Sequence, residues 1–172
     1  GTGTSQGIPI IGSKHPVCLS KNPKDKRLRS SIWVQWDEMD IVVDCGPDFR
    51  QQMLSSKCPK VDALLFTHEH ADHTAGLDDI RPFAFKVGAL AVFGLERVIK
   101  NLSKRFDYIF SDENKYPGAP SVTTTIIDPT KPFTAASKTI TPLVVSHYGL
   151  EVLGFRFGLF AYITDMFSIT DV

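Results

Sequence analysis

Apolar and polar positions along the first half of the chain predict short strands separated by turns. A β-rich run at 32–36 and an apolar run at 41–43 predict a hairpin of two strands. Asp48 then follows a break in the apolar pattern and is expected to cap a short helix that ends near Ser55. A mostly apolar stretch at 61–67 predicts a further strand that is buried on both faces.

The second half of the chain begins with a helical pattern and continues with strands. Apolar residues recur at helical spacing between residues 95 and 106, which predicts an amphipathic helix that packs on the core. Polar segments at 13–31 and 111–121 predict loops. Together the elements favour two sheets packed against each other with helices outside, an α/β sandwich. The later predicted strands are 122–127, 140–145, 153–158 and 160–164.

Composition indicates one globular domain and excludes several classes of protein. The 172 residues are 42% apolar, which is enough for a core, and 19 basic residues balance 19 acidic ones. This balance argues against non-specific binding to nucleic acid or anionic membranes. No apolar run approaches the roughly 18–20 residues that span a bilayer, and no signal peptide is visible. Three cysteines do not form a disulfide framework, so we expect a cytoplasmic protein without membrane contact.

The strongest candidate for chemistry is a histidine cluster directly after the predicted buried strand. Three of the five histidines of the chain fall within residues 68–73, together with two acids. Residues two apart in an extended segment point the same way, so His68 and His70 can bind one cation. Where the chain curls into the next helix, Asp72 and His73 can bind a second cation nearby. Imidazole and carboxylate together suit zinc, manganese or iron better than calcium.

A site for two metals needs ligands from elsewhere in the fold, and two candidates lie at the ends of predicted strands. His147 follows the apolar run 143–145, and Asp165 follows the strand 160–164. A carboxylate at a strand end can bridge two cations through its two oxygens. We therefore expect His147 and Asp165 to complete the cluster.

These motifs resemble a known family. The pattern H-x-H-x-D-H at 68–73, with S-H at 146–147 and Y-I-T-D at 162–165, is similar to the signature of the metallo-β-lactamase superfamily of dinuclear hydrolases. Further segments are similar to the phosphodiesterases associated with the carbon–phosphorus lyase pathway, and the resemblance covers essentially the whole chain. The same fold also hosts tRNA 3′-end nucleases, thioester hydrolases and lactamases. The further segments are G-T-G-T-S-Q-G at 1–7, D-K-R-L-R-S-S at 25–31, D-C-G-P-D-F-R at 44–50 and T-A-G-L-D-D-I-R-P-F at 74–83.

The resemblance implies an αββα sandwich formed by a single domain, residues 1–172, and a site for two divalent metal ions, zinc or manganese. Asp44 would orient a ligand histidine, and Glu69 either does likewise or is an exposed acid. The implied ligands are His68, His70 and His147 on one metal, Asp72 and His73 on the other, and Asp165 as the bridge.

The resemblance also implies a reaction. Two divalent ions lower the pKa of a shared water, so hydroxide becomes available at neutral pH to attack phosphorus in line with the leaving alkoxide. Asp72 is the catalytic candidate because it can hold the proton of the nucleophile. The implied substrate is a small or cyclic phosphodiester. A long nucleic acid is not favoured because the chain has no net charge.

Two departures from the family pattern add expectations. Members of the family complete the metal site with a further C-terminal histidine, but no histidine follows Asp165 in this sequence. The strand that is expected before the glycine-rich segment at 1–7 is also missing. We therefore expect an incomplete domain, truncated at the C-terminus, whose second metal site is open on one side and whose own activity is in question. Relatives also carry a C-x-C-x-x-C zinc cluster where this chain has Ser13, His15 and Cys18. Two donors without partners do not favour a structural zinc there.

Several alternatives stay open at this stage. The basic residues between Lys21 and Arg29 form either a phosphate-facing patch or a solvated loop, and the solvated loop is favoured. Another hydrolase on the same site, chiefly a tRNA 3′-end nuclease, is the first alternative function. A metal-binding sensor or scaffold without turnover is an alternative of another class. A homodimer is as compatible with the sequence as a monomer.

Overall fold

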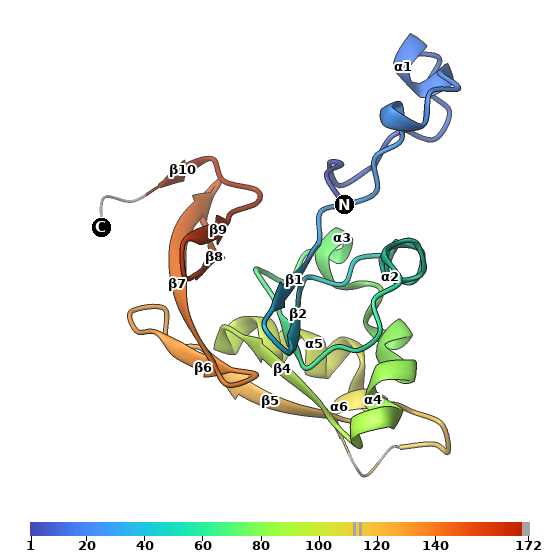
Figure 1. Ribbon diagram of the computed structural model, residues 1–172. Coiled ribbons are helices and arrows are strands. Elements are labelled where there is room, and N and C mark those ends of the chain that lie inside the picture. The colour runs from blue at the N-terminus through green and yellow to red at the C-terminus, as the bar shows by residue number, and fades with distance from the viewer. Residues whose placement is uncertain (112, 114, 170–172) are drawn as a thin grey trace.

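The computed structural model describes residues 1–111, 113 and 115–169, and two sheets dominate it (Figure 1). The first sheet has the strand order β1-β2-β3-β4-β5. Its first pair is antiparallel and its other pairs are parallel. Strands β2 to β5 therefore all end at the same edge of the sheet. The strands are β1 (Ile32–Trp36), β2 (Met39–Val43), β3 (Ala63–Leu65), β4 (Leu90–Gly94) and β5 (Val122–Ile126).

The second sheet is antiparallel throughout. Its order is β10-β7-β8-β9, and β6 also pairs with β7. The long strands β7 and β8 form a hairpin in which His147 pairs with Leu150, so Tyr148 and Gly149 make a two-residue turn. The strands are β6 (Phe133–Ala135), β7 (Lys138–His147), β8 (Leu150–Phe157), β9 (Phe160–Tyr162) and β10 (Ser168–Ile169).

The helices α2 to α6 gather beside the first sheet (Figure 1). Helix α5 packs Val98, Ile99 and Leu102 into the core and leaves its charged residues outside, as its apolar periodicity predicts. Among the described residues, no helix combines the length and the apolar character needed to cross a membrane. The helices are α1 (Pro16–Leu19), α2 (Phe49–Ser56), α3 (Ala71–Thr74), α4 (Arg81–Val87), α5 (Glu96–Arg105) and α6 (Asp107–Phe110), with short 3-10 turns η1 (Pro23–Asp25) and η2 (Leu77–Ile80).

The core lies between the sheets and under the helices. Strand β3 is fully buried, as a parallel central strand requires. Rings from both sheets meet at Phe133, whose centroid lies 5.6 Å from that of Phe93 and 6.2 Å from that of Phe155. The amide of Leu153 in β8 donates to the carbonyl oxygen of Thr67 at 3.1 Å and so ties the second sheet to the segment after β3. The two sheets and the helices confirm the mixed α/β sandwich.

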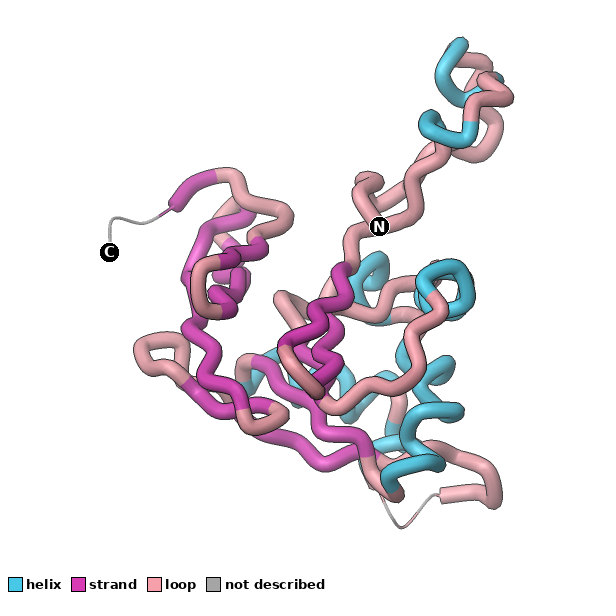
Figure 2. Tube along the Cα trace, in the orientation of Figure 1, coloured by secondary structure: helices cyan, strands magenta, loops and turns pink. Residues whose placement is uncertain are grey.

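Residues 1–31 form an arm that projects from the sandwich (Figure 2). Single bridges pair Gly3 with Arg29 and Ile8 with Arg27, so the outgoing and returning segments run side by side. The arm is loop apart from α1 and η1 at its far end (Figure 2). The predicted loop at 13–31 is therefore confirmed in outline, with two short helical turns inside it.

The structure differs from the prediction made from the sequence in two places. Asp48 precedes α2, but its carboxylate does not cap the helix. It accepts instead from the backbone amide of Arg29 at 2.8 Å and from the guanidinium of Arg29 at 3.0 Å. Strand β4 and helix α4 fall in a stretch for which the apolar pattern makes no prediction, since a run as short as β4 fits a strand or a helix segment equally well.

Candidate metal centre

The carboxyl edge of the parallel strands carries the first part of the site. Asp44 follows β2 directly, and its amide donates to the carbonyl oxygen of Leu65 in β3 at 2.9 Å. His68 follows β3 after two buried residues. Because β2 and β3 are parallel neighbours, these two polar side chains leave the sheet at the same edge. Asp44 has a φ of 62°, a left-handed conformation that aspartate tolerates better than most residues.

Asp44 is fully buried and binds three hydrogen-bond donors. It accepts from the backbone amide of Thr67 at 2.9 Å, from the hydroxyl of Thr67 at 2.8 Å and from Nδ1 of His73 at 2.7 Å. Burial raises the pKa of Asp44, and the hydrogen bonds from His73 and Thr67 oppose that rise. The carboxylate therefore holds the segment after β3 and helix α3 together, and its contact with the ring of His73 agrees with the histidine-orienting role that the family resemblance implies.

This hydrogen-bond chain orients two histidine rings. Since the Thr67 hydroxyl donates to Asp44, its oxygen is free to accept from Nδ1 of His68, which lies 3.0 Å away. In the tautomers that these contacts favour, His68 and His73 each carry hydrogen on Nδ1 and present the lone pair of Nε2. Outer partners of this kind are what fix the ring orientation of metal-binding histidines.

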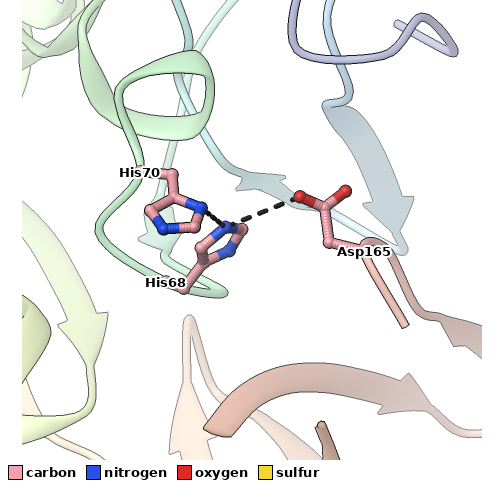
Figure 3. Close-up of side chains that lie close together, drawn as sticks. All are labelled: His68, His70 and Asp165. Carbon is pink, nitrogen blue, oxygen red and sulfur yellow. Dashed lines mark hydrogen bonds and ion pairs between the residues drawn. The ribbon is translucent and has the colours of Figure 1, made fainter. Parts of the chain in front are cut away.

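The Nε2 atoms of His68 and His73 both face Asp165. Nε2 of His68 lies 3.0 Å from Nδ1 of His70 and 3.6 Å from Oδ2 of Asp165 (Figure 3). The same Oδ2 lies 3.1 Å from Nε2 of His73, which in turn lies 3.3 Å from Oδ2 of Asp72. Two groups of three donors result, and Asp165 belongs to both. They are His68, His70 and Asp165, and Asp72, His73 and Asp165.

The spacing of these atoms fits metal coordination. Ligand atoms lie about 2.0–2.1 Å from a tetrahedral zinc ion, which separates any two of them by about 3.3 Å. The measured separations of 3.0 to 3.6 Å fall around that value. Imidazole nitrogens and carboxylate oxygens also form a donor set that zinc and manganese accept. The residues present therefore fit divalent metal ions, and Asp165 is common to both groups of donors.

The charges at the site fit the same interpretation. Burial alone would lower the pKa of His73, but its hydrogen bonds with Asp165, Asp44 and Asp72 raise that pKa to about 12. Burial and the neighbouring histidines lower the pKa of His68 to about 3. The hydrogen bond with His73 lowers the pKa of Asp165 and that of Asp72. Without a metal, His73 therefore holds a proton on Nε2 as well, and a divalent ion that took the place of this proton would lie near the same three carboxylates. His68 remains neutral and able to bind an ion.

His147 lies beside this cluster but does not join either group of donors. Its ring centroid is 5.9 Å from that of His68 and 5.7 Å from that of His70. The end of β7 therefore brings His147 to the site from the second sheet, as its position after an apolar run predicts. Asp165 comes from the turn after β9, where it has a φ of 53° and accepts from the Thr164 hydroxyl at 3.0 Å.

A cavity of about 570 Å³ opens over the cluster. Its walls come from the arm, from the segment after β3 and from the second sheet. A volume of this size is typical of sites for small molecules. The lining residues are Thr4, Ser5, His70, Asp72, His147, Tyr148, Asp165, Met166 and Phe167.

Two glycines lock the metal-binding segment to the end of β2. A Cβ added to Gly46 would lie 1.9 Å from the carbonyl oxygen of Asp72, and one added to Gly76 would lie 2.1 Å from the carbonyl oxygen of Gly46. The amide of Cys45 also donates to the carbonyl oxygen of His73 at 2.9 Å. The glycines of the D-C-G-P and T-A-G-L segments thus permit a close backbone contact, a role that spacing alone does not reveal.

Glu69 and the possible zinc donors on the arm are further candidates from the sequence. Glu69 is partly buried, and its carboxylate forms an ion pair with Arg97 at 2.5 Å, so it is not the exposed acid without a partner that one of the two expectations describes. Ser13, His15 and Cys18 lie on the arm, where Nδ1 of His15 accepts from the amide of Val17 at 3.3 Å and caps α1. None of the basic side chains of the arm lines the cavity described above.

Comparison with known proteins agrees with this geometry. Residues 40–172 match the beta-lactamase superfamily domain. Over 98% of the chain, the structure resembles that of a new diphosphatase from the PhnP family, with a TM-score of 0.88 and 38% identity, and it covers 64% of that chain.

Two curated proteins are also similar in sequence. An octanoyltransferase of Porphyromonas gingivalis is 41% identical over 170 residues, which are 98% of this chain but 34% of that protein. A ribonuclease Z of Clostridioides difficile is 26% identical over 151 residues, 81% of this chain and 47% of that protein. The chain thus spans between a third and a half of these curated relatives. With its fold, its histidine cluster and the domain match, the chain belongs to the metallo-β-lactamase superfamily, close to the PhnP branch.

Proposed function

We propose that this chain is a metal-dependent hydrolase that uses two divalent ions to cleave a small phosphodiester. The observation that carries the proposal is the position of Oδ2 of Asp165, within 3.6 Å of Nε2 of His68 and 3.1 Å of Nε2 of His73. One carboxylate oxygen between two sets of donors is the arrangement that a bridged pair of ions requires. The similarity to a PhnP-family diphosphatase supports a phosphoryl substrate.

In this proposal the candidate ligands keep the roles that the family resemblance implies. His68, His70 and His147 would hold one ion, Asp72 and His73 would hold the other, and Asp165 would contact both. When bound, two divalent ions supply positive charge for the phosphoryl oxygens and make hydroxide available near neutral pH.

Residues of the chain orient the candidate metal ligands and can hold the proton of the attacking water. Asp44 and Thr67 hold the rings of His68 and His73 with their Nε2 atoms toward Asp165. Asp72 lines the cavity, and the hydrogen bond with His73 lowers its pKa, so the side chain is a carboxylate that can hold the proton of an attacking water by accepting a hydrogen bond from it.

A nuclease of the ribonuclease Z type is the second candidate, and the Clostridioides protein favours it. That function needs a basic surface that contacts the phosphates of a long RNA. Among the described residues that line the cavity, none is Lys or Arg. The cavity therefore favours a small substrate. The name of the Porphyromonas protein supports no proposal, since two thirds of that protein lie outside the match.

Native mass spectrometry combined with a turnover assay tests the proposal. The protein is loaded with Zn²⁺ or Mn²⁺ in separate samples, and hydrolysis of bis(p-nitrophenyl) phosphate is followed. We expect two bound ions and turnover, and we expect Asp165→Ala to lose at least one ion and to reduce kcat/KM by more than about 100-fold. His15→Ala, on the arm, is the matched control and should change neither readout.

Three results would contradict the proposal. The first is a mass shift of a single ion or none. The second is turnover that survives Asp165→Ala unchanged. The third is two bound ions without hydrolysis of any diester, which would support a metal-binding scaffold instead.

A further inference from the structure

Two exposed aromatic rings stand on the rim of the cavity. The ring centroids of Tyr148 and Phe167 lie 4.7 Å apart, and the ring planes differ by 32°. Tyr148 is 78% exposed and Phe167 is 65% exposed, so neither ring contributes to the core. Both residues line the 570 Å³ cavity over the metal centre. We call Tyr148 and Phe167 the rim pair.

The rim pair is fixed relative to the metal centre. The amide of Phe167 donates to the carbonyl oxygen of Ser146 at 2.8 Å, and Ser168 of β10 pairs with the same residue of β7. The ring centroid of Tyr148 lies 5.3 Å from that of His147. Both rings are therefore held by the strand that also carries a candidate metal ligand.

Tyr148 occupies a backbone position that disfavours it. The turn between β7 and β8 has φ values of 50° at Tyr148 and 86° at Gly149. Two positive φ angles in a two-residue hairpin turn favour Asn-Gly, and a bulky residue at the first position is strained. Burial in the core does not compensate for this strain, because the ring is mostly exposed. A role in binding accounts for an aromatic ring at this position.

The other walls of the cavity limit the charge of the ligand. Thr4 and Ser5 contribute hydroxyl groups from the arm, and Asp72 and Asp165 contribute carboxylates. No Lys or Arg belongs to the lining among the described residues. Outside the metal centre these walls offer no cation to a second negative charge, so a phosphodiester suits them better than a phosphomonoester dianion.

We propose that the rim pair is a stacking surface for the nucleobase of a small nucleotide phosphodiester whose phosphoryl group lies over the metal centre. This inference rests on the proposed function and names its substrate class. Aromatic side chains bind bases by stacking with little preference among them, since every base presents a π face. The enzyme is therefore expected to discriminate between diesters with and without a base, and only weakly between bases.

Calorimetric titration of the Zn²⁺-loaded protein tests the inference with two probes, the methyl esters of adenosine 5′-monophosphate and of ribose 5-phosphate. The probes differ at C1 of the ribose, where one carries the base and the other a hydroxyl group. We expect Tyr148→Ala to weaken binding of the adenosine probe by about 5- to 100-fold and to leave the ribose probe unchanged. Tyr148→Trp should retain the preference for the adenosine probe.

Tyr148→Asn separates binding from folding. It creates the Asn-Gly pair that the turn favours, so the melting temperature should stay equal or rise while binding of the adenosine probe weakens. Phe160→Ala removes another exposed ring, outside the cavity, and is the matched control that should change neither probe.

The outcomes also distinguish this inference from the proposed function. Equal binding of the two probes, or unchanged binding after Tyr148→Asn, would overturn the inference even if the protein hydrolyses diesters. A preference for the adenosine probe that depends on Tyr148, in a protein that hydrolyses no diester, would support the rim pair and contradict the proposed hydrolase.

Discussion

The two sides of the metal centre are built in different ways. On the side of the first sheet, His68 and His73 are buried, and hydrogen bonds from Thr67 and Asp44 fix their rings. On the side of the second sheet, His147 and Asp165 are partly exposed; His147 is the last residue of β7, and Asp165 lies in the turn after β9. The core thus preorganises the first side, whereas strand pairing positions the second side.

This difference predicts how each side responds to substitution. A change on the first side disturbs buried hydrogen bonds, so it should affect both the free energy of unfolding and metal affinity. A change on the second side should affect metal affinity and ligand binding with less effect on folding.

Asp44→Ala should have the largest effect. It removes the acceptor of three buried donors and places alanine at a φ of 62°. We expect a loss of about 3–5 kcal/mol in the free energy of unfolding, measured by urea denaturation of the metal-free protein. A loss below about 1 kcal/mol would mean that Asp44 does not hold the first side together.

Asp44→Asn is the matched variant, because asparagine tolerates the left-handed backbone and keeps an acceptor for Thr67. Its amide group cannot accept from Nδ1 of His73 as well, so that ring loses its fixed tautomer. We expect a smaller stability loss than in Asp44→Ala, with metal affinity lowered about 10- to 100-fold in a chelator competition assay.

Gly46→Ala should have an intermediate effect. The new Cβ would lie 1.9 Å from the carbonyl oxygen of Asp72, so the backbone that carries Asp72 and His73 must move. We expect a loss of about 1–3 kcal/mol in the free energy of unfolding and weaker zinc binding. Gly94→Ala is the control, since its Cβ would be in ordinary contact at 3.4 Å from Ile99. Equal melting temperatures for the two variants would contradict the close contact at Gly46.

Arg97→Met should have the smallest effect and tests the link between the two sides. The guanidinium binds the carboxylate of Glu69 on the first side and the carbonyl oxygen of Glu151 on β8. The ion pair is partly exposed, so we expect a loss of about 0.2–1 kcal/mol in thermal denaturation and two bound ions still present. Lys100→Met, which removes an exposed pair with Glu96, should produce no resolvable change. Loss of an ion in Arg97→Met would show that the sides are coupled more tightly than their contacts indicate.

The local parts of the fold and the site are predictable from the sequence. The histidine pattern at 68–73 predicts two groups of ligands from spacing alone, and the structure brings His68, His70, Asp72 and His73 together with Asp165. The apolar face of α5 and the buried strand β3 also follow from periodicity. These features depend on neighbours in sequence, where spacing determines geometry.

The long-range contacts are not predictable in the same way. The bond of Thr67 to Asp44 joins residues 23 positions apart, and nothing in their spacing indicates it. The pairing of Asp48 with Arg29 competes with helix capping and prevails because the arm returns beside α2. The rim pair depends on β10 adding to β7, a two-residue strand that no periodicity reveals.

The hairpin of β7 and β8 has a consequence for how this site can change in evolution. Side chains alternate between the faces of a strand, so a shift of one residue would turn His147 and its neighbours to the opposite face. The two-residue turn at Tyr148 and Gly149 sets the register of this hairpin. Single-residue insertions or deletions between Ser146 and Leu150 should therefore abolish the site, even when every ligand is retained. The length of this segment is constrained as strictly as the identity of the ligands, and variation here must proceed by substitution.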